Sequence, residues 1–209
     1  MELPELYEYI DKVEDYIGMK ITRLKHNKTF DEYFYEVPSR GRFHELGQIR
    51  GFPPVLFGCY INRDVKVRCM QKHLKEDGAI LNYIGFTVDE VKRSSGKQFT
   101  STPNRTYRFP LIEWGWGDDE CLSYLESKGL SHPLQGLRSG CWLCPKQPVG
   151  SLRYIYNKHP DLWLKLRAYE KDAPAGFHPN MDLNVLAERF RNEQEQTALS
   201  DFDGGGDGN

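Results

Sequence analysis

Two cysteines separated by two residues most strongly constrain what this chain can fold into. Cys141 and Cys144 lie in the run GCWLCP, between Gly140 and Pro145. Thiols at this spacing can turn toward one metal ion, and the glycine permits the tight bend that such a knuckle needs. Because a tetrahedral thiolate site takes four soft ligands, the pair predicts two further ligands elsewhere in the chain.

Cys59 and Cys69 are the candidates for the two remaining ligands. A site built from both pairs would tie distant segments of the chain together. Alternatively, Cys59 and Cys69 bind no metal and are small, buried side chains that pack like apolar residues. Cys121 is expected to lie in the core, because it shares a helical face with Leu125. Four thiolates accept either Zn²⁺ or a 4Fe–4S cluster, so the cysteines alone do not choose between the two.

Length and composition favour a folded protein without a membrane span. The 209 residues predict one domain, or one domain with an appendage, and a hydrophobic fraction of 39% allows a core. The net charge of −2 gives no global sign of binding to nucleic acid or to an anionic membrane. No signal-peptide pattern opens the chain and its cysteines are odd in number. These two features predict a reducing compartment, which we take to be the cytoplasm.

Hydrophobic periodicity predicts an alternation of helices and strands. In the first half we expect a helix over 4–17, a strand over 19–24, a helix over 65–75 and a buried strand over 79–86. In the second half we expect an extended segment over 107–112 and helices over 118–128, 151–157, 160–171 and 182–196. A helix followed by a strand is half of a βαβ unit, so the chain begins inside an α/β pattern whose first strand is missing.

Five stretches of the chain follow the order and content of a known family. They are residues 2–10, Cys59 with 66–68, 84–90 with Arg93, 110–114 with 118–119, and 138–145. Together they resemble the phosphoadenosine phosphosulfate (PAPS) reductase family of the PP-loop ATP pyrophosphatase superfamily, in its GCWxCP metal-binding branch. The resemblance covers about residues 2–171. It implies a Rossmann-like, adenine-nucleotide α-hydrolase-like sheet, and either reduction of phosphoadenylyl sulfate or sulfur transfer to another acceptor.

Three features depart from that family. The chain has no SGGxDS phosphate loop, its C-terminal tail has no cysteine, and Cys59 is single where the cluster-bearing sulfate reductases carry adjacent cysteines. A phosphate loop supplied from an upstream segment would make the protein an oxidoreductase or transferase acting on sulfur groups. Without that loop, we expect a non-catalytic, metal-stabilised binding subunit of a nucleic-acid modification or defence assembly, or an inactive remnant.

Four basic side chains are implied by the resemblance to face the phosphate or sulfate groups of an adenylyl-sulfate-type nucleotide. They are Lys66, Arg138, Arg93 and Arg63. An arginine offers a planar fork that matches such oxyanions. The alternative for each is an ordinary solvated side chain, or an ion pair with a carboxylate such as that of Asp64.

The expected organisation has three parts. Residues 1–135 form an α/β core that lacks its first strand and phosphate loop, residues 136–198 form a helical subdomain with the cysteine knuckle, and residues 199–209 form a disordered tail. The apolar face of the helix over 4–17 is expected to stay exposed or to bury against a second copy or a partner subunit. Nucleic acid is a weaker expectation as a partner, because the overall charge is acidic.

Overall fold

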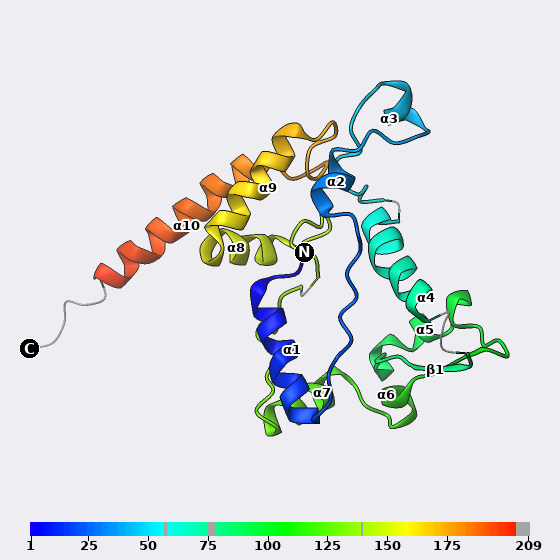
Figure 1. Cartoon of the computed structure of the whole chain (residues 1–209). Coiled ribbons are helices and arrows are strands. Elements are labelled where there is room, and N and C mark those ends of the chain that lie inside the picture. Colours follow the sequence, from blue (N-terminus) through cyan, green and yellow to red (C-terminus); the bar gives the residue numbers. More distant parts are fainter. Residues whose placement is uncertain (57, 75–77, 139, 204–209) are drawn as a thin grey trace, which may run out of the picture. The chain divides into compact units, whose positions relative to one another are not determined.

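The computed structural model describes residues 1–56, 58–74, 78–138 and 140–203, with the backbone alone over 197–203. Helices dominate, and two of the described segments form a small parallel sheet (Figure 1). The described part of the chain is therefore a helix-rich mixture of helix and strand, which is compatible with the α/β prediction. The chain divides into two compact units that are interleaved in sequence. Unit 1 contains Met1–Leu3, His26–Val65 and Gly136–Asn209, and unit 2 contains Pro4–Lys25 and Lys66–Gln135.

One boundary between the units coincides with the predicted division at residue 135. Residues 26–65, however, group with the segment after 135 rather than with the α/β part. The organisation into domains stays a prediction. Among the described residues, no helix is both long enough and apolar enough to cross a membrane.

Unit 1 is built from helices. They are α2 (Phe30–Phe34), α3 (Arg42–Glu45), α8 (Val149–Lys158), α9 (Pro160–Asp172) and α10 (Leu183–Asp203). The π-helical turn η1 (Asn62–Val67) crosses the boundary between the units in sequence. Helices α8, α9 and α10 pack on one another (Figure 1). Helix α9 begins at a proline, as the sequence predicts, because the first position of a helix needs no backbone N–H.

The core of unit 1 is a cluster of aromatic rings. Phe34 is fully buried, and its ring centroid lies 5.1 Å from that of Phe52 and 4.8 Å from that of Tyr169. Phe30 packs edge-on against Tyr169 as well, with 5.2 Å between the ring centroids. Aromatic side chains bury large areas, so this cluster supplies much of the hydrophobic stabilisation that joins α2 to α9.

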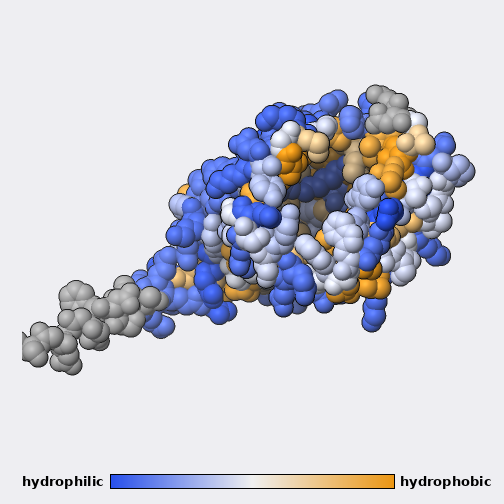
Figure 2. Space-filling view, turned by 90° about the horizontal axis from the view of Figure 1, so that it is seen from below, coloured by the Kyte–Doolittle hydropathy of each residue, from blue (hydrophilic) through white to orange (hydrophobic). Residues whose placement is uncertain are grey.

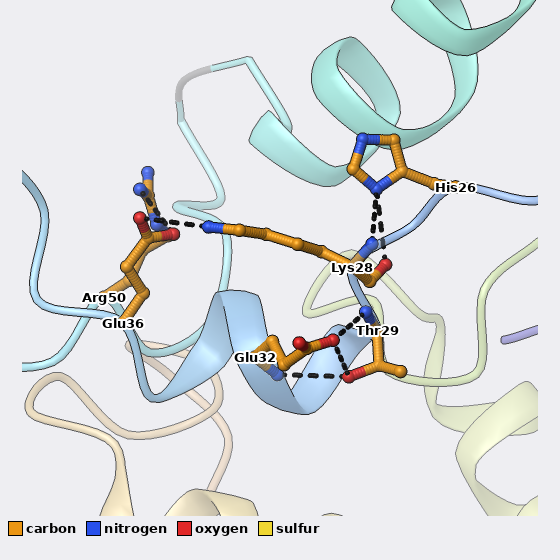
Figure 3. Close-up of polar contacts among 6 residues, drawn as sticks. All are labelled: His26, Lys28, Thr29, Glu32, Glu36 and Arg50. Carbon is orange, nitrogen blue, oxygen red and sulfur yellow. Dashed lines mark hydrogen bonds and ion pairs between the residues drawn. The ribbon is translucent and has the colours of Figure 1, made fainter.

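A capping box sets the start of α2. The Thr29 hydroxyl accepts the backbone N–H of Glu32, and the Glu32 carboxylate accepts the backbone N–H of Thr29 at 2.6 Å (Figure 3). These two bonds satisfy donors that the first turn of a helix otherwise leaves unpaired. They also lower the pKa of the Glu32 carboxyl group, because both the backbone N–H and the hydroxyl of Thr29 donate to its charged form.

Removing this cap gives a measurable prediction. We expect Thr29→Ala to lower the free energy of unfolding by about 0.5–2 kcal/mol, because the helix loses its side-chain acceptor. The matched control is Thr29→Ser, which keeps the hydroxyl and should stay close to the wild type. Urea denaturation of the three proteins measures the difference. Equal stability of the alanine and serine variants would show that the cap contributes nothing.

Unit 2 contains the sheet. Its helices are α1 (Pro4–Ile17), α4 (Arg68–Leu74), α5 (Val91–Ser94), α6 (Pro110–Glu113) and α7 (Asp118–Ser127), with the 3₁₀ turns η2 (Val88–Glu90) and η3 (Lys97–Phe99). Strand β1 (Ile80–Tyr83) pairs in parallel with β2 (Arg105–Arg108), and Ile80 lies opposite Arg105. The strand expected over 79–86 is confirmed in its centre. The segment expected over 107–112 becomes the end of β2 and then α6, because Pro110 cannot donate to a ladder.

The strand expected over 19–24 is absent from the structure. Among the described residues no strand lies beside this segment, and the carboxylates of α1 hold it instead. Glu14 accepts the Lys20 ammonium group at 2.8 Å and the Ile21 backbone N–H at 2.9 Å. Asp11 accepts the Arg23 guanidinium at 2.5 Å. The segment is therefore fixed along α1 by side chains rather than by a strand ladder.

The pKa of Glu14 gives a second prediction. The hydrogen bond from Lys20, followed by the bond from the Ile21 N–H, lowers the pKa of this carboxyl group. A lowered pKa means that the carboxylate stabilises the fold above its unfolded-state pKa, and that this stability is lost as the pH falls through the lower, folded value. We expect Glu14→Gln to reduce stability at about pH 7 and to flatten its decline between about pH 5 and pH 3.

The control for this prediction is Glu8→Gln, on the exposed face of the same helix. It should leave the acid decline of stability unchanged. Denaturant titrations at several pH values compare the two variants. An unchanged acid profile in Glu14→Gln would contradict the assigned role of Glu14.

Helix α10 extends further than the sequence predicts. It was expected to end near 196, and its backbone continues to Asp203. No glycine or proline occurs between 183 and 203, so no local signal stops the helix there. Residues 199–203 of the predicted disordered tail are thus helical, and residues 204–209 lie outside the described part of the chain.

Candidate metal centre

The cysteine pair lies in a tight turn of unit 1. The backbone N–H of Cys144 donates to the Cys141 carbonyl at 3.1 Å, which closes the turn between the two thiols. Gln147 holds this turn from both ends. Its backbone N–H donates to the Cys144 carbonyl at 3.0 Å, and its side-chain amide donates to the Cys141 carbonyl at 3.0 Å. Trp142 and Leu143, the two residues between the thiols, are only 6% and 3% exposed, so both side chains of the turn are buried.

Two of the sulfur atoms accept backbone hydrogen bonds. The Cys141 thiol accepts the N–H of Leu143. The Sγ atom of Cys59 accepts the N–H of Asn62 at 3.4 Å. At Cys141 the bond from Leu143 lowers the pKa of the thiol and so favours the thiolate, which is the form that binds metals.

Cys59 and Cys141 approach the same buried phenol. Burial raises the pKa of Tyr60, and the thiols of Cys59 and Cys141 both raise it further. Burial also raises the pKa of the Cys141 thiol to about 11, with a smaller increase from Cys144 and an opposing effect of the Leu143 N–H. The Tyr60 hydroxyl donates to the Gly51 carbonyl at 2.6 Å. The Cys59 and Cys141 thiols therefore both lie within electrostatic range of the Tyr60 phenol, and Cys144 lies within range of Cys141.

The other two cysteines belong to unit 2. Cys69 lies on α4, and Cys121 lies on α7, half-buried rather than in the core that the sequence predicts. Burial raises the pKa of the Cys121 thiol. In the described part of the chain, no three histidine, cysteine, aspartate or glutamate side chains are gathered closely enough to hold a metal ion. The four-cysteine site predicted from the sequence thus stays a prediction.

Two of the predicted anion-binding arginines lie in unit 1, and both bind groups of the protein itself. Arg63 forms two hydrogen bonds of 2.8 Å with the Asp64 carboxylate, which is the alternative that the sequence left open. Arg138 donates through Nη1 to the Lys146 carbonyl at 2.7 Å. Its backbone N–H donates to the Ser151 hydroxyl at 3.0 Å. Arg138 therefore braces the cysteine turn against α8.

The other two predicted anion-binding residues lie in unit 2. Arg93 forms an ion pair with Glu90, and its guanidinium lies 4.4 Å from the ring centroid of Phe86. Lys66 is exposed. The structure thus places Arg63 and Arg138 in one unit and Arg93 and Lys66 in the other.

Comparison with known proteins adds no family to these observations. No family of known proteins matches the chain, and neither a curated protein nor a solved structure matches it. The assignment of a function therefore depends on the motifs and on the geometry within each unit.

Sequence reasoning did not identify two residues around the cysteine turn. Gln147 is 2% exposed and binds both ends of the turn, and Tyr60 lies beside two thiols. Tyr60 directly follows Cys59, and this adjacency is the one signal that could have identified it. Nothing in the sequence distinguishes Gln147 from a surface glutamine, because its role depends on backbone carbonyl groups.

Proposed function

We propose that the chain is a metal-holding protein of the PAPS reductase type, in which Cys59, Cys141 and Cys144 supply thiolates to one centre in unit 1. The observation that carries this proposal is the approach of Cys141 to the segment of Cys59 and Tyr60, because both thiols raise the pKa of the Tyr60 phenol. The sulfur of each of the two cysteines also accepts a backbone N–H. Soft sulfur donors suit Zn²⁺ and iron–sulfur clusters. Cys69 belongs to unit 2, and its ligation stays a prediction from the sequence.

The donor set fits a structural or a redox centre. Either centre would stabilise the folded form, because its binding free energy adds to that of folding. The chain's own residues prepare the site: the Leu143 N–H opposes the burial that raises the pKa of the Cys141 thiol, and Gln147 and Arg138 fix the turn that carries the pair. Hydrogen bonds of this kind around a metal site orient its ligands and tune their basicity.

The proposed chemistry concerns sulfur-bearing adenine nucleotides. Parallel pairing of β1 with β2 supports the Rossmann-like part of the proposal, since parallel strands are typical of folds with helices on both faces of the sheet. In this proposal the substrate is an adenylyl-sulfate-type nucleotide, and the reaction is reduction of its sulfate group or transfer of sulfur. In unit 1 the residues proposed to meet its anionic groups are Arg63 and Arg138, and Lys66 and Arg93 of unit 2 stay predictions from the sequence.

Metal analysis tests the centre directly. Protein purified without oxygen should contain stoichiometric zinc and be colourless, or contain iron and show the broad visible absorption of an iron–sulfur cluster. Protein with neither metal, even after reconstitution with zinc or with iron and sulfide, would refute the proposal. Titration calorimetry with adenylyl sulfate, and with AMP as the control that lacks the sulfate, tests the proposed substrate class.

The contacts that the arginines make within the protein support a second candidate function. Arg63 and Arg93 are paired with carboxylates, and Arg138 is bound to a backbone carbonyl, so binding a nucleotide would cost these contacts. This observation favours a metal-stabilised binding subunit without catalysis. A protein that holds metal but does not bind adenylyl sulfate would support this second function. Steeply salt-dependent binding to duplex DNA would then identify nucleic acid as the partner.

A further inference from the structure

The three packed helices α8, α9 and α10 of unit 1 line a cavity (Figure 1). Its volume is about 550 Å³, which lies within the range of small-molecule sites. The lining residues of α9 recur every three or four positions from Pro160 to Arg167, and those of α10 do so from Asn184 to Arg191. Residues at this spacing share one face of a helix, so one face of each helix forms a wall of the cavity.

Aromatic rings supply the apolar part of the lining. Tyr156 of α8 and Trp163 of α9 both line the cavity, and their ring centroids lie 5.4 Å apart with the rings nearly perpendicular. Both rings also pack on Phe190 of α10, at 5.5 Å from Tyr156 and 5.9 Å from Trp163. Leu164, which is 64% exposed, adds an aliphatic side chain to the lining. The cavity can therefore cover the apolar body of a small molecule.

Trp163 also brings an unpaired donor to the cavity. The residue is only 3% exposed, and its buried indole N–H has no acceptor within the described part of the chain. The buried Tyr60 hydroxyl, in contrast, donates to the Gly51 carbonyl. Buried donors are nearly always paired, because a donor that leaves water without finding an acceptor costs free energy. An acceptor on a molecule bound in the cavity would complete the Trp163 N–H.

The charged side chains of the lining favour an anion. Arg167 and Arg191 line the cavity, and among its described lining residues Glu188 is the one carboxylate. Arg167 donates through Nη2 to the Asn184 side-chain oxygen, which leaves its other guanidinium donors available. No hydrogen bond or ion pair within the described residues engages the side chain of Arg191. The lining therefore has an excess of positive charge and of hydrogen-bond donors.

A larger cavity of about 890 Å³ in unit 1 shares Arg167 with this one, but its charges are balanced. Among its described lining residues Glu170 and Asp182 offset Arg167 and Lys171, with histidine counted as neutral. The smaller cavity is thus the better site for an anion. On the face that Figure 2 shows, polar side chains predominate over α10, so the helix presents no broad apolar surface to another protein there. A small molecule suits this place better than a protein partner.

We propose that the smaller cavity binds a small organic anion. Its apolar body packs against Tyr156 and Trp163, and its anionic oxygens accept the Trp163 N–H and the Arg167 guanidinium. These two donors lie one turn apart on the same face of α9, so one carboxylate or phosphate group can meet both. Arg191 supplies a second positive charge from α10. None of the residues proposed for the metal centre or for the nucleotide lines this cavity, so the inference stands apart from both.

NMR titration of the full chain tests the site. Benzoate and phenyl phosphate should each move the indole N–H resonance of Trp163 downfield, because that proton becomes hydrogen bonded. Benzamide has the shape of benzoate without the charge, and should bind at least about tenfold more weakly. Tighter binding of benzoate would assign carboxylates as the ligand class, and tighter binding of phenyl phosphate would assign phosphate monoesters. Binding of neither anion, or binding that leaves the Trp163 resonance unchanged, would overturn the proposal.

Substitutions of the two donors locate the anion. Trp163→Phe keeps an aromatic ring and removes the N–H, so the dissociation constant of the preferred anion should rise about tenfold. Arg167→Gln removes a charged donor and should raise the constant at least as much. Because Arg167 is exposed, this variant tests the site even if Trp163→Phe does not fold.

The matched control is Arg189→Gln on α10. Arg189 pairs with Glu193 and does not line the cavity, so its loss should leave the affinity for the anion unchanged. Thermal melting checks that each variant is folded. Equal affinities of Arg167→Gln and Arg189→Gln would mean that surface charge alone attracts the anion, and would refute a site built around Arg167.

Discussion

Replacing Cys141 with serine is expected to remove the proposed metal centre of unit 1 and to lower the thermal stability of the protein strongly. A serine hydroxyl keeps its proton near neutral pH and is a poor ligand for soft metals, so metal affinity should fall by more than about 100-fold. Structural zinc contributes about 10–16 kcal/mol of apparent binding free energy in small peptides, and that energy is also folding energy. Cys144→Ser should behave in the same way. Elemental analysis and thermal melting measure both effects.

The control is Cys121→Ser, on α7 of unit 2, which should keep its metal and melt close to the wild type. A chelator added to the wild type should reproduce the loss of stability seen in Cys141→Ser, and this measurement does not require the variant to fold. Equal metal retention in all three serine variants would exclude the cysteine turn as the ligand source. Equal melting of the chelated and untreated wild type would exclude a stabilising role for the metal.

Helix positions were predictable because their signals are local. The helix expected over 4–17 is confirmed at both ends, where Pro4 opens the first turn and Gly18, with a φ of 66°, ends the last. Gly18 adopts this left-handed conformation at little cost, which other residues do not. The proline at position 160 set the start of α9 in the same way. Such signals need only a few neighbouring residues.

Strand pairing was less predictable because it depends on distant partners. The alternation of residues 19–24 is typical of a strand, but the sequence could not show that Glu14 and Asp11 would bind the segment instead. The interleaving of the two units has the same origin. Residues 26–65 group with the chain after 135 through aromatic contacts such as that of Phe34 with Tyr169. No local sequence pattern predicts these contacts.

In the candidate site too, local features were predictable from the sequence and contacts between distant segments were not. The spacing of Cys141 and Cys144 predicted their shared turn, whereas the approach of Cys141 to the segment of Cys59 and Tyr60 depends on tertiary structure. The pairing of Arg63 with Asp64 was foreseen as an alternative, because the two residues are adjacent. The bond from Arg138 to the Lys146 carbonyl was not, since every residue offers a backbone carbonyl and the sequence marks none as the acceptor.

Leu166→Ala is expected to destabilise unit 1 by about 2–5 kcal/mol. Leu166 is fully buried on α9, the helix that packs against both α8 and α10. Its truncation removes apolar contacts and leaves a cavity, and the two neighbouring helices limit how far the site can collapse. A loss of this size is a large part of the stability of a typical domain, so the variant should unfold at clearly lower urea concentration.

Leu164→Ala is a closely matched control, because it makes the same change two residues away on the same helix. Leu164 is 64% exposed, so its truncation removes little buried surface and should change the free energy of unfolding by less than about 0.5 kcal/mol. Both substitutions gain similar helix propensity, and the difference between them therefore isolates the contribution of burial. Similar losses in the two variants would mean that α9 does not direct Leu166 into the core, and the packing of α8, α9 and α10 would have to be revised.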